Sequence, residues 1–217
     1  MAWSTALDIY CERLGPGLLA EPLNAVSNLA FLVAAISIHR RIGMRRDFDL
    51  RLLAVLLALV GCGSLVFHTI ATVWASVLDV AFIALFVLLF VDRALRRLFG
   101  WSAKQAAAAL GAVLLATAAL AATLRLPWLN GSELYLGPWL ALIGLALGCP
   151  HAAAAGWLRI AAVLFGFSML FRSLDLQWCD VWPLGTHFAW HLNNALVLWC
   201  AMRALLAPAG PIGAATR

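Results

Sequence analysis

The sequence has few charged residues for its length. Only 12% of its 217 residues are Asp, Glu, Lys or Arg, whereas 65% are hydrophobic. Soluble domains average about 25% charged and 45–50% apolar residues. This composition is too apolar for a water-soluble domain. It predicts that most of the chain lies in lipid.

Three sequence patterns are also lacking. The five cysteines show no CxxC spacing, which argues against a structural zinc knot. The first residues carry no basic region ahead of an apolar run, so we predict no cleavable signal peptide and expect the first span to direct insertion. No internal repeat is visible, which disfavours an inverted-repeat transporter.

What the sequence does contain is a series of apolar segments. A helix that crosses the hydrocarbon layer needs about 20 mainly apolar residues. Seven candidate segments cover residues 23–38, 52–70, 74–91, 106–124, 134–147, 152–171 and 184–206. We therefore predict an all-α, polytopic membrane protein with seven transmembrane helices. Residues 23–206 would form one domain, between an outer-side segment, 1–22, and a flexible inner-side tail, 207–217.

The basic residues give an orientation for these spans. With the N-terminus outside, the inner side holds Arg40, Arg41, Arg45, Arg46, Arg51, Arg93, Arg96, Arg97, Lys104, Arg159, Arg203 and Arg217. The outer side holds Arg13, Arg125 and Arg172. Lys and Arg concentrate on the inner side of membrane proteins, so the prediction is N-out and C-in. The net charge of +5 then reflects orientation, and no nucleic-acid partner is expected.

The same charge pattern fits two locations. In a bacterial inner membrane the outer end would face the periplasm. In a membrane of the endoplasmic reticulum or Golgi type it would face the lumen, and both locations stay open.

Polar residues interrupt three of the apolar spans at one depth. His187 and His191 are four residues apart, so on a helix they share a face and can reach one metal ion. Ser64 and His68 have the same spacing, and Asp79 lies one turn into the next span. The predicted topology puts all five near the outer end. Since ionisable groups rarely face lipid, we expect them to form a functional site.

This set of side chains suits a zinc-dependent hydrolase. Three imidazoles with one open position are the coordination of a catalytic zinc, here from His68, His187 and His191. Zinc lowers the pKa of a bound water to about 7. Asp79 could act as general base or orient a histidine, and Ser64 could donate a hydrogen bond to a developing oxyanion.

Other polar residues have plainer explanations. Ser27 and Asn28 would support helix packing through their side-chain hydrogen bonds, which is common in membranes. His39 stands beside Arg40 and is read as an interfacial residue. His151 follows Pro150 and is read as a loop residue. Neither histidine is assigned to the metal.

The motifs together resemble a known family. They are Tyr10-Cys11-Glu12, Ala20-Glu21-Pro22-Leu23-Asn24, Ser27-Asn28, Ser64-Leu65-Val66-Phe67-His68 with Asp79, and His187-Phe188-Ala189-Trp190-His191. This pattern, which covers nearly the whole chain, resembles the alkaline ceramidases, within a seven-span hydrolase superfamily that includes the adiponectin-type receptors. The resemblance implies a zinc-dependent hydrolase that splits ceramide, or a related N-acyl lipid, into a sphingoid base and a fatty acid.

The resemblance also implies an N-terminal calcium site, to which Glu12, Glu21 and Asn24 would correspond. The match is incomplete, because Ile9 takes the place of the family's aspartate and Leu14 that of an asparagine. Calcium prefers six to eight oxygen ligands, so a site with fewer carboxylates is expected to be weak.

A disulfide is a further implication of the resemblance. Cys11 and Cys179 both fall on the predicted outer side, where the family carries a bridge. Such a bond would tie the N-terminal segment to the loop before the last span, in an oxidising compartment.

Two other classes of function are compatible with these residues. A lipid receptor or binding protein could keep the zinc without turnover, although the short inner loops leave little surface for a partner. A transporter or proton relay could use the same intramembrane histidines and aspartate. Acyl chain length and oligomeric state depend on cavity shape and interfaces, which the sequence leaves open.

Overall fold

The computed structural model describes residues 2–124 and 126–207, and their regular structure is helical. The longer helices are α2 (Leu29–Ile42), α3 (Phe48–Ile70), α4 (Val73–Leu98), α5 (Ala103–Thr123), α6 (Leu136–Gly148), α7 (Ala152–Leu174) and α8 (His187–Leu206). A short α1 (Pro22–Ser27) precedes α2. The all-α prediction is confirmed. Arg125, Arg217 and the predicted tail from residue 208 onward lie outside the described residues.

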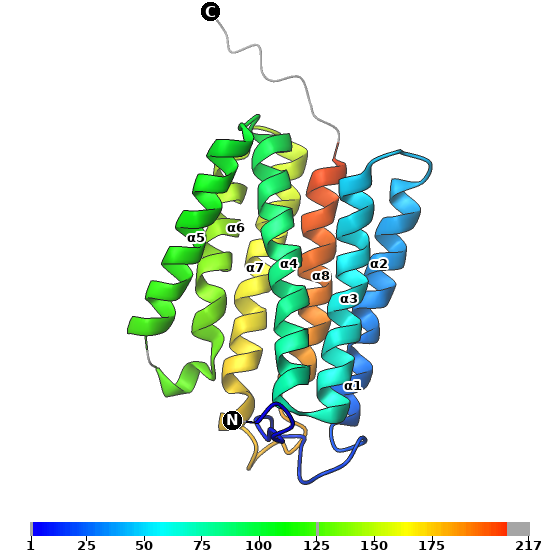
Figure 1. The fold of residues 1–217 in the computed structure, drawn as a ribbon, viewed down its shortest axis with the longest axis vertical. Coiled ribbons are helices and arrows are strands. Elements are labelled where there is room, and N and C mark those ends of the chain that lie inside the picture. The colour runs from blue at the N-terminus through cyan, green and yellow to red at the C-terminus, as the bar shows by residue number, and fades with distance from the viewer. Residues whose placement is uncertain (1, 125, 208–217) are drawn as a thin grey trace, which may run out of the picture.

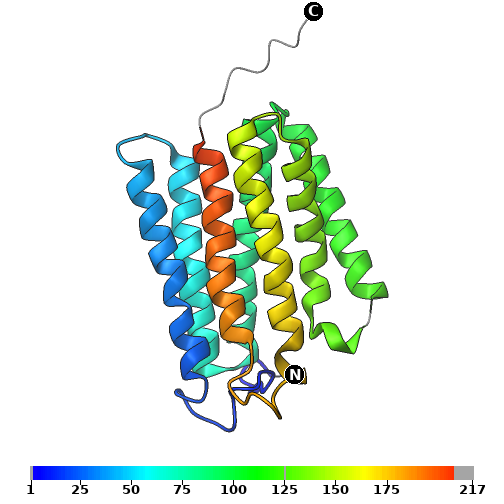
Figure 2. The same ribbon diagram turned by 180° about the vertical axis from the view of Figure 1, so that it is seen from behind.

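The long helices stand side by side as a closed ring (Figures 1 and 2). Each packs against the next along the chain from α2 to α8, and α8 packs against α2 to complete the circle. The N-terminal segment lies across the end of the bundle where α3 meets α4 (Figure 1). There, Ala6 and Thr72 form an isolated β-bridge.

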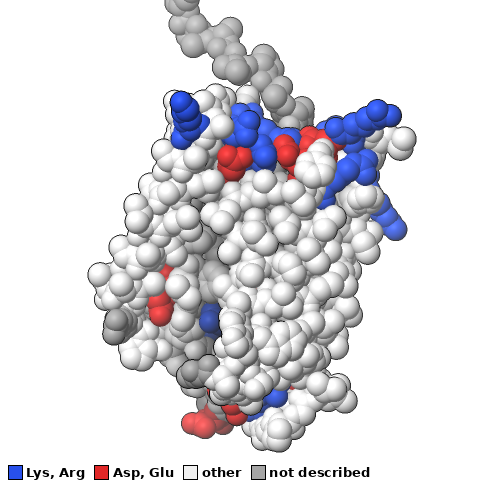
Figure 3. Space-filling model, viewed as in Figure 1, with Lys and Arg blue, Asp and Glu red and all other residues white. Residues whose placement is uncertain are grey.

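Several helices are consistent with a multi-pass membrane protein. Five segments of the described chain are long and apolar enough to cross a membrane: Pro22–Ile42, Phe48–Ile70, Val73–Leu98, Ala103–Thr123 and Ala152–Gln177. The apolar segment Ser132–Gly148 is shorter, and α8 carries the histidine pair and two asparagines. Lys and Arg gather over one end of the molecule, and the flank below shows few charged groups (Figure 3).

The first predicted span is divided at Asn28, between α1 and α2. The Ser27 hydroxyl and the Asn28 side-chain amide both donate hydrogen bonds to the carbonyl oxygen of Asn24, each at 2.8 Å. Side chains that bond to the backbone in this way compete with the helical ladder and bend a helix. The break turns the polar face of α1 toward the interior, where Asn24 and Asn28 are buried.

The ends of several helices differ from the predicted spans, and α4, α7 and α8 show the physical reasons. α4 and α7 continue to Leu98 and Leu174, beyond the predicted ends at 91 and 171. Basic residues follow the apolar part of each helix, and they favour a helix C-terminus because they interact with its dipole. α8 begins at His187, not at 184, because Gly185 adopts a positive φ of 63°.

Two glycines let helices approach α3 closely near the predicted site. A Cβ atom at Gly61 would lie 2.8 Å from Phe31 Cβ on α2. A Cβ atom at Gly63 would lie 2.8 Å from a ring carbon of Phe82 on α4 and 3.4 Å from the Asp79 Cα. Small residues commonly permit such contacts between membrane helices. Gly63 thereby brings Asp79 beside Ser64.

Candidate metal centre

Three buried histidines converge at the end of the bundle covered by the N-terminal segment. His68 comes from the last turn of α3, and His187 and His191 from the first turns of α8. One ligand atom from each lies within 4.8 Å of the others, and no side chain is more than 2% exposed. This is the predicted trio, and within the described residues it is the one such group that could hold a metal ion.

The orientation of His68 is fixed by Glu21. The Nδ1 atom of His68 lies 2.6 Å from Glu21 Oε2. Because a carboxylate accepts hydrogen bonds, Nδ1 carries the proton and Nε2 keeps its lone pair. Nε2 is buried and has no hydrogen-bond partner among the described residues. A metal ion would satisfy it, and a carboxylate behind a ligating histidine is a common arrangement in metal sites.

His191 is held in the same way by Ser27 on α1. The Ser27 hydroxyl lies 2.7 Å from His191 Nδ1 and donates its hydrogen to the carbonyl of Asn24. With that hydrogen used, Ser27 accepts the hydrogen bond from Nδ1–H of His191. The Nε2 lone pair of His191 is therefore directed at the cluster.

His187 is positioned through its backbone and its ring face. Asp175 Oδ1 accepts hydrogen bonds from the backbone N–H groups of His187 and Thr186, at 2.9 and 2.7 Å. Asp175 thus caps α8 from a distance, whereas the Thr186 side chain makes no capping bond. The Tyr10 ring stacks on the imidazole of His187 with 3.6 Å between centroids. His187 Nδ1 is buried without a partner in the described chain.

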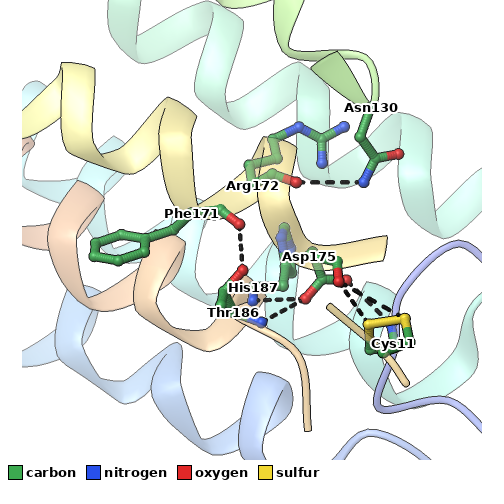
Figure 4. Close-up of a disulfide and its surroundings, with 8 residues drawn as sticks. Cys11, Asn130, Phe171, Arg172, Asp175, Thr186 and His187 are labelled. Carbon is green, nitrogen blue, oxygen red and sulfur yellow. Dashed lines mark hydrogen bonds between the residues drawn. A yellow bond between two sulfur atoms is a disulfide. The ribbon is translucent and has the colours of Figure 1, made fainter. Parts of the chain in front are cut away.

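The predicted disulfide is present beside this cap. Cys11 and Cys179 are bonded, with 5.2 Å between their Cα atoms. The backbone N–H of Cys11 donates to the other oxygen of Asp175 at 3.0 Å (Figure 4). One carboxylate therefore links the N-terminal segment, the end of α7 and the start of α8.

Both predicted catalytic residues lie at the cluster. The Ser64 hydroxyl is buried 3.4 Å from His191 Nε2. The Asp79 carboxyl is close enough to Ser64 and His68 to interact with both. Its Oδ1 atom is buried and unpaired within the described residues. Asp79 thus presents a free acceptor next to the histidines.

The predicted calcium ligands are engaged in other contacts. Both oxygens of Glu12 accept backbone hydrogen bonds, from Leu23 at 2.6 Å and Asn24 at 2.8 Å. Glu21 accepts from His68, from Arg13 and from the Asn24 side chain. Glu12 and Glu21 thus use their oxygens in hydrogen bonds, whereas the Asn24 Oδ1 atom is buried without a partner among the described residues, and the calcium site stays a prediction.

Arg13 supplies a positive charge at that position. Its Nε donates to Glu21 Oε1, and its two Nη atoms donate to the backbone oxygens of Gly15, Gly17 and His68. Burial raises the pKa of Glu21, but the hydrogen bonds from His68, Arg13 and Asn24 outweigh it and hold that pKa below its usual range. The N-terminal segment thus brings its own cation to the carboxylate.

Sequence reasoning missed part of the support around the histidines. Ser27 was interpreted as a packing residue and Glu21 as a calcium ligand, whereas both contact histidines directly. Their shared polar face on the first span was a usable signal. For Asp175 and Arg13 the sequence contains no comparable signal, since each contacts residues that are far away in the chain. His39 is exposed and His151 precedes α7, so neither belongs to the cluster.

Comparison with known proteins does not assign the chain to a family. No protein-family model matches the chain, and no curated protein matches it.

Proposed function

We propose that the chain is a zinc-dependent amidohydrolase that cleaves ceramide or a related N-acyl lipid within a membrane. In this proposal its seven helices are seven spans, with the N-terminus and the histidine cluster on the outer side. The observation that carries the proposal is the buried trio of His68, His187 and His191, with Nδ1 of His68 and His191 held by Glu21 and Ser27. Imidazoles whose Nδ1 atoms are held by other side chains, so that Nε2 faces the cluster, favour metal binding over a purely structural role in the core.

The donor set supports zinc in particular. Three imidazole nitrogens without a fourth protein ligand are the pattern of catalytic zinc, because a position remains for water or substrate. Imidazole also suits copper, iron and nickel, so metal analysis of the purified protein is needed to identify the ion.

The side chains around the trio have roles that fit amide hydrolysis. A zinc ion bound there would supply Lewis acidity toward water and the acyl oxygen. Asp79 is placed to take a proton from the attacking water and return it to the leaving amine nitrogen as the C–N bond breaks. Ser64 can donate its hydroxyl hydrogen to the oxygen of the attacked carbonyl. The water thus ends as the OH of a fatty acid and an N–H of the amine.

A lipid substrate is supported by the position of the site and by the sequence motifs. The cluster is built from α1, α3 and α8 at one end of a bundle whose flank carries few charges, so an acyl chain could lie along that flank while its amide reaches the histidines. The resemblance of the motifs to the alkaline ceramidases favours an amide over an ester. It is the reason for testing ceramide first.

A lipid panel tests the proposal. Purified, zinc-loaded protein is assayed for fatty-acid release from ceramides of several acyl lengths, other N-acyl amides and ester lipids. We expect release from amides by the wild type, none by His191→Ala, and normal release by His39→Ala, whose histidine is exposed and outside the cluster. If folded, zinc-loaded protein releases nothing from any lipid, a zinc-containing receptor or binding protein becomes the better explanation.

A further inference from the structure

Arg172, in the last turn of α7, is a half-buried cation whose electrostatic partner, Asp79, lies beyond ion-pair distance. It makes no ion pair with a carboxylate of the described residues. Its side chain makes one hydrogen bond there, from Nη1 to the Tyr10 hydroxyl at 2.8 Å. Its Nε is buried without an acceptor. A guanidinium has five N–H donors, so most of them lack a protein partner.

The immediate surroundings of Arg172 are mainly aromatic, and the charge of Asp79 acts on it from farther away. Its guanidinium carbon lies 5.8 Å from the ring centroid of Tyr10 and 5.7 Å from those of Tyr135 and Trp190. Rings at this distance attract a cation through their π faces, but they carry no net charge. Removing a cation from water is costly unless an anion and hydrogen bonds compensate, and three rings compensate only in part.

Arg13 shows how the same chain satisfies an arginine whose role is to hold other side chains in place. Its guanidinium reaches one carboxylate and three backbone oxygens. Arg172 is half-buried and has no such set of acceptors among the described residues. The contrast indicates that Arg172 is arranged for an acceptor that arrives from outside the chain.

The place of Arg172 identifies which molecule could bring that acceptor. The Tyr10 ring stacks on His187 with one face, and its hydroxyl bonds Arg172, so a single aromatic ring separates the guanidinium from the histidine trio. In Figure 4 the Arg172 side chain points away from the disulfide and toward the segment that carries Asn130. A lipid whose amide lies at the trio could therefore place a second polar group at Arg172.

We propose that Arg172 forms an anion subsite that binds a carboxylate carried by a lipid whose amide lies at the histidine trio. A planar carboxylate matches the guanidinium fork and can take two of its free donors at once. The carboxylate could belong to the head group of an acidic N-acyl lipid or to the fatty acid that hydrolysis releases. This inference rests on the proposed function for the choice of lipid, but the binding itself needs neither metal nor turnover.

Binding to metal-free protein tests the subsite separately from hydrolysis. Radiolabelled hexadecanoate and hexadecanol, which differ in the carboxylate, are titrated against the chelator-treated full chain in neutral-lipid nanodiscs. We expect hexadecanoate to bind the wild type more tightly than the alcohol. Arg172→Gln should lose about tenfold or more for the acid and little for the alcohol, since a charged hydrogen-bonded pair is lost.

Arg159→Gln is the matched control, because Arg159 is an exposed arginine on the same helix. It should leave the binding of both ligands unchanged. Arg172→Lys keeps the charge but not the planar fork, and should retain part of the preference for the acid. Formation of the Cys11–Cys179 bridge reports that each variant is folded. Equal binding of acid and alcohol by folded wild type, or unchanged acid binding by folded Arg172→Gln, would overturn the proposal.

Two further assays on zinc-loaded protein distinguish the sources of the carboxylate. If the head group supplies it, N-palmitoyl glycine should be hydrolysed faster than N-palmitoyl ethanolamine, and Arg172→Gln should lose this preference. If the product supplies it, the two amides should react alike, and inhibition by added hexadecanoate should weaken in Arg172→Gln. Absence of hydrolysis with both amides would contradict the proposed function and leave the binding result standing.

Discussion

Arginine–carboxylate pairs occur at both ends of the helix bundle, in opposite surroundings. At the basic end, Arg97 bonds Asp47 and Asp49, and these side chains are 27–30% exposed. At the end with the histidines, Arg13 pairs with Glu21, and these side chains are 6% and 2% exposed. The chemistry is the same, but only one pair is removed from water.

The difference indicates what each pair can do. Exposed ion pairs contribute little, about 0–1 kcal/mol, because water and salt screen them. A buried pair need not stabilise a fold more than apolar residues would, but breaking it leaves an uncompensated charge. We infer that the exposed pairs only join the start of α3 to the end of α4, whereas Arg13 and Glu21 hold His68 in position.

The largest expected effect follows from removing a histidine at the buried end. His68→Ala takes away one of three ligands, so bound zinc should fall from about one ion per chain to a small fraction of that. His39→Ala, the same change at an exposed position, should keep its zinc. Elemental analysis after dialysis against a weak chelator gives the answer, and equal zinc in both variants would remove His68 from the site.

The second-largest effect is the difference in stability between variants of the two arginines. Arg13→Gln should lower the free energy of unfolding by about 3–5 kcal/mol, since the Glu21 carboxylate is left buried without its cation. Arg97→Gln at the exposed end should cost less than about 1 kcal/mol. Chemical unfolding in detergent micelles measures both. Similar losses at the two ends would contradict the distinction drawn here.

Arg13→Gln also tests the role of Arg13 in metal binding. A group that orients a ligand through a carboxylate typically affects metal affinity by about 10–100-fold. Zinc affinity should therefore weaken in Arg13→Gln and be partly restored in Arg13→Lys. The wild type should bind zinc equally well with and without a calcium-selective chelator, because Arg13 already pairs with the Glu21 carboxylate. Loss of zinc on calcium removal would show that calcium is needed.

The disulfide should contribute somewhat less than the buried pair. Replacing Cys11 with Ser removes a bridge of a kind that typically stabilises by about 2–4 kcal/mol. The variant should unfold at lower temperature, and its N-terminal segment should be cut faster by protease. Cys62→Ser is the control, because Cys62 is a free, exposed cysteine. Identical behaviour of the two variants would mean that the bridge does not hold the segment.

The smallest effect is expected from pH at the basic end. The hydrogen bond from Arg97 holds the pKa of Asp47 below its usual range. The stabilisation of the folded state by ionised Asp47 is therefore complete above the ordinary aspartate pKa of about 4. It is lost as pH falls through the lower pKa that Asp47 has in the folded protein. Asp47→Asn keeps the cap on Leu50, so wild type and variant should differ by less than about 1 kcal/mol at pH 7. That difference should shrink toward pH 3, and a constant difference would exclude this linkage.

The fold and the central residues could be predicted from sequence because their signals are local. Runs of apolar residues define the helices, and the four-residue spacing of His187 and His191 defines a shared face. Joining them to His68 needed only the alternating direction of successive spans. The structure places the three together, as that alternation predicts.

The residues that position the histidines could not be predicted in the same way. Asp175 caps α8 from 12 residues before His187, and Arg13 contacts the carbonyl of His68 from 55 residues before it. Such contacts depend on how loops cross the end of the bundle, and no helical period encodes them. The sequence picks out Glu21 as a calcium ligand, which stays a prediction, but it does not show that Glu21 also bonds Arg13 and His68.

The bridge between Cys11 and Cys179 also has a consequence for how the protein is made. Its sulfur atoms are 168 residues apart, so the second cysteine leaves the ribosome only after every helix up to α7. Oxidation of the pair would then mark a nearly completed chain, and a reduced Cys11 would mark an unfinished one. Once closed, the bridge turns residues 11–179 into a covalent ring. A single cut in any loop within that ring would leave the two pieces joined until a reductant is added.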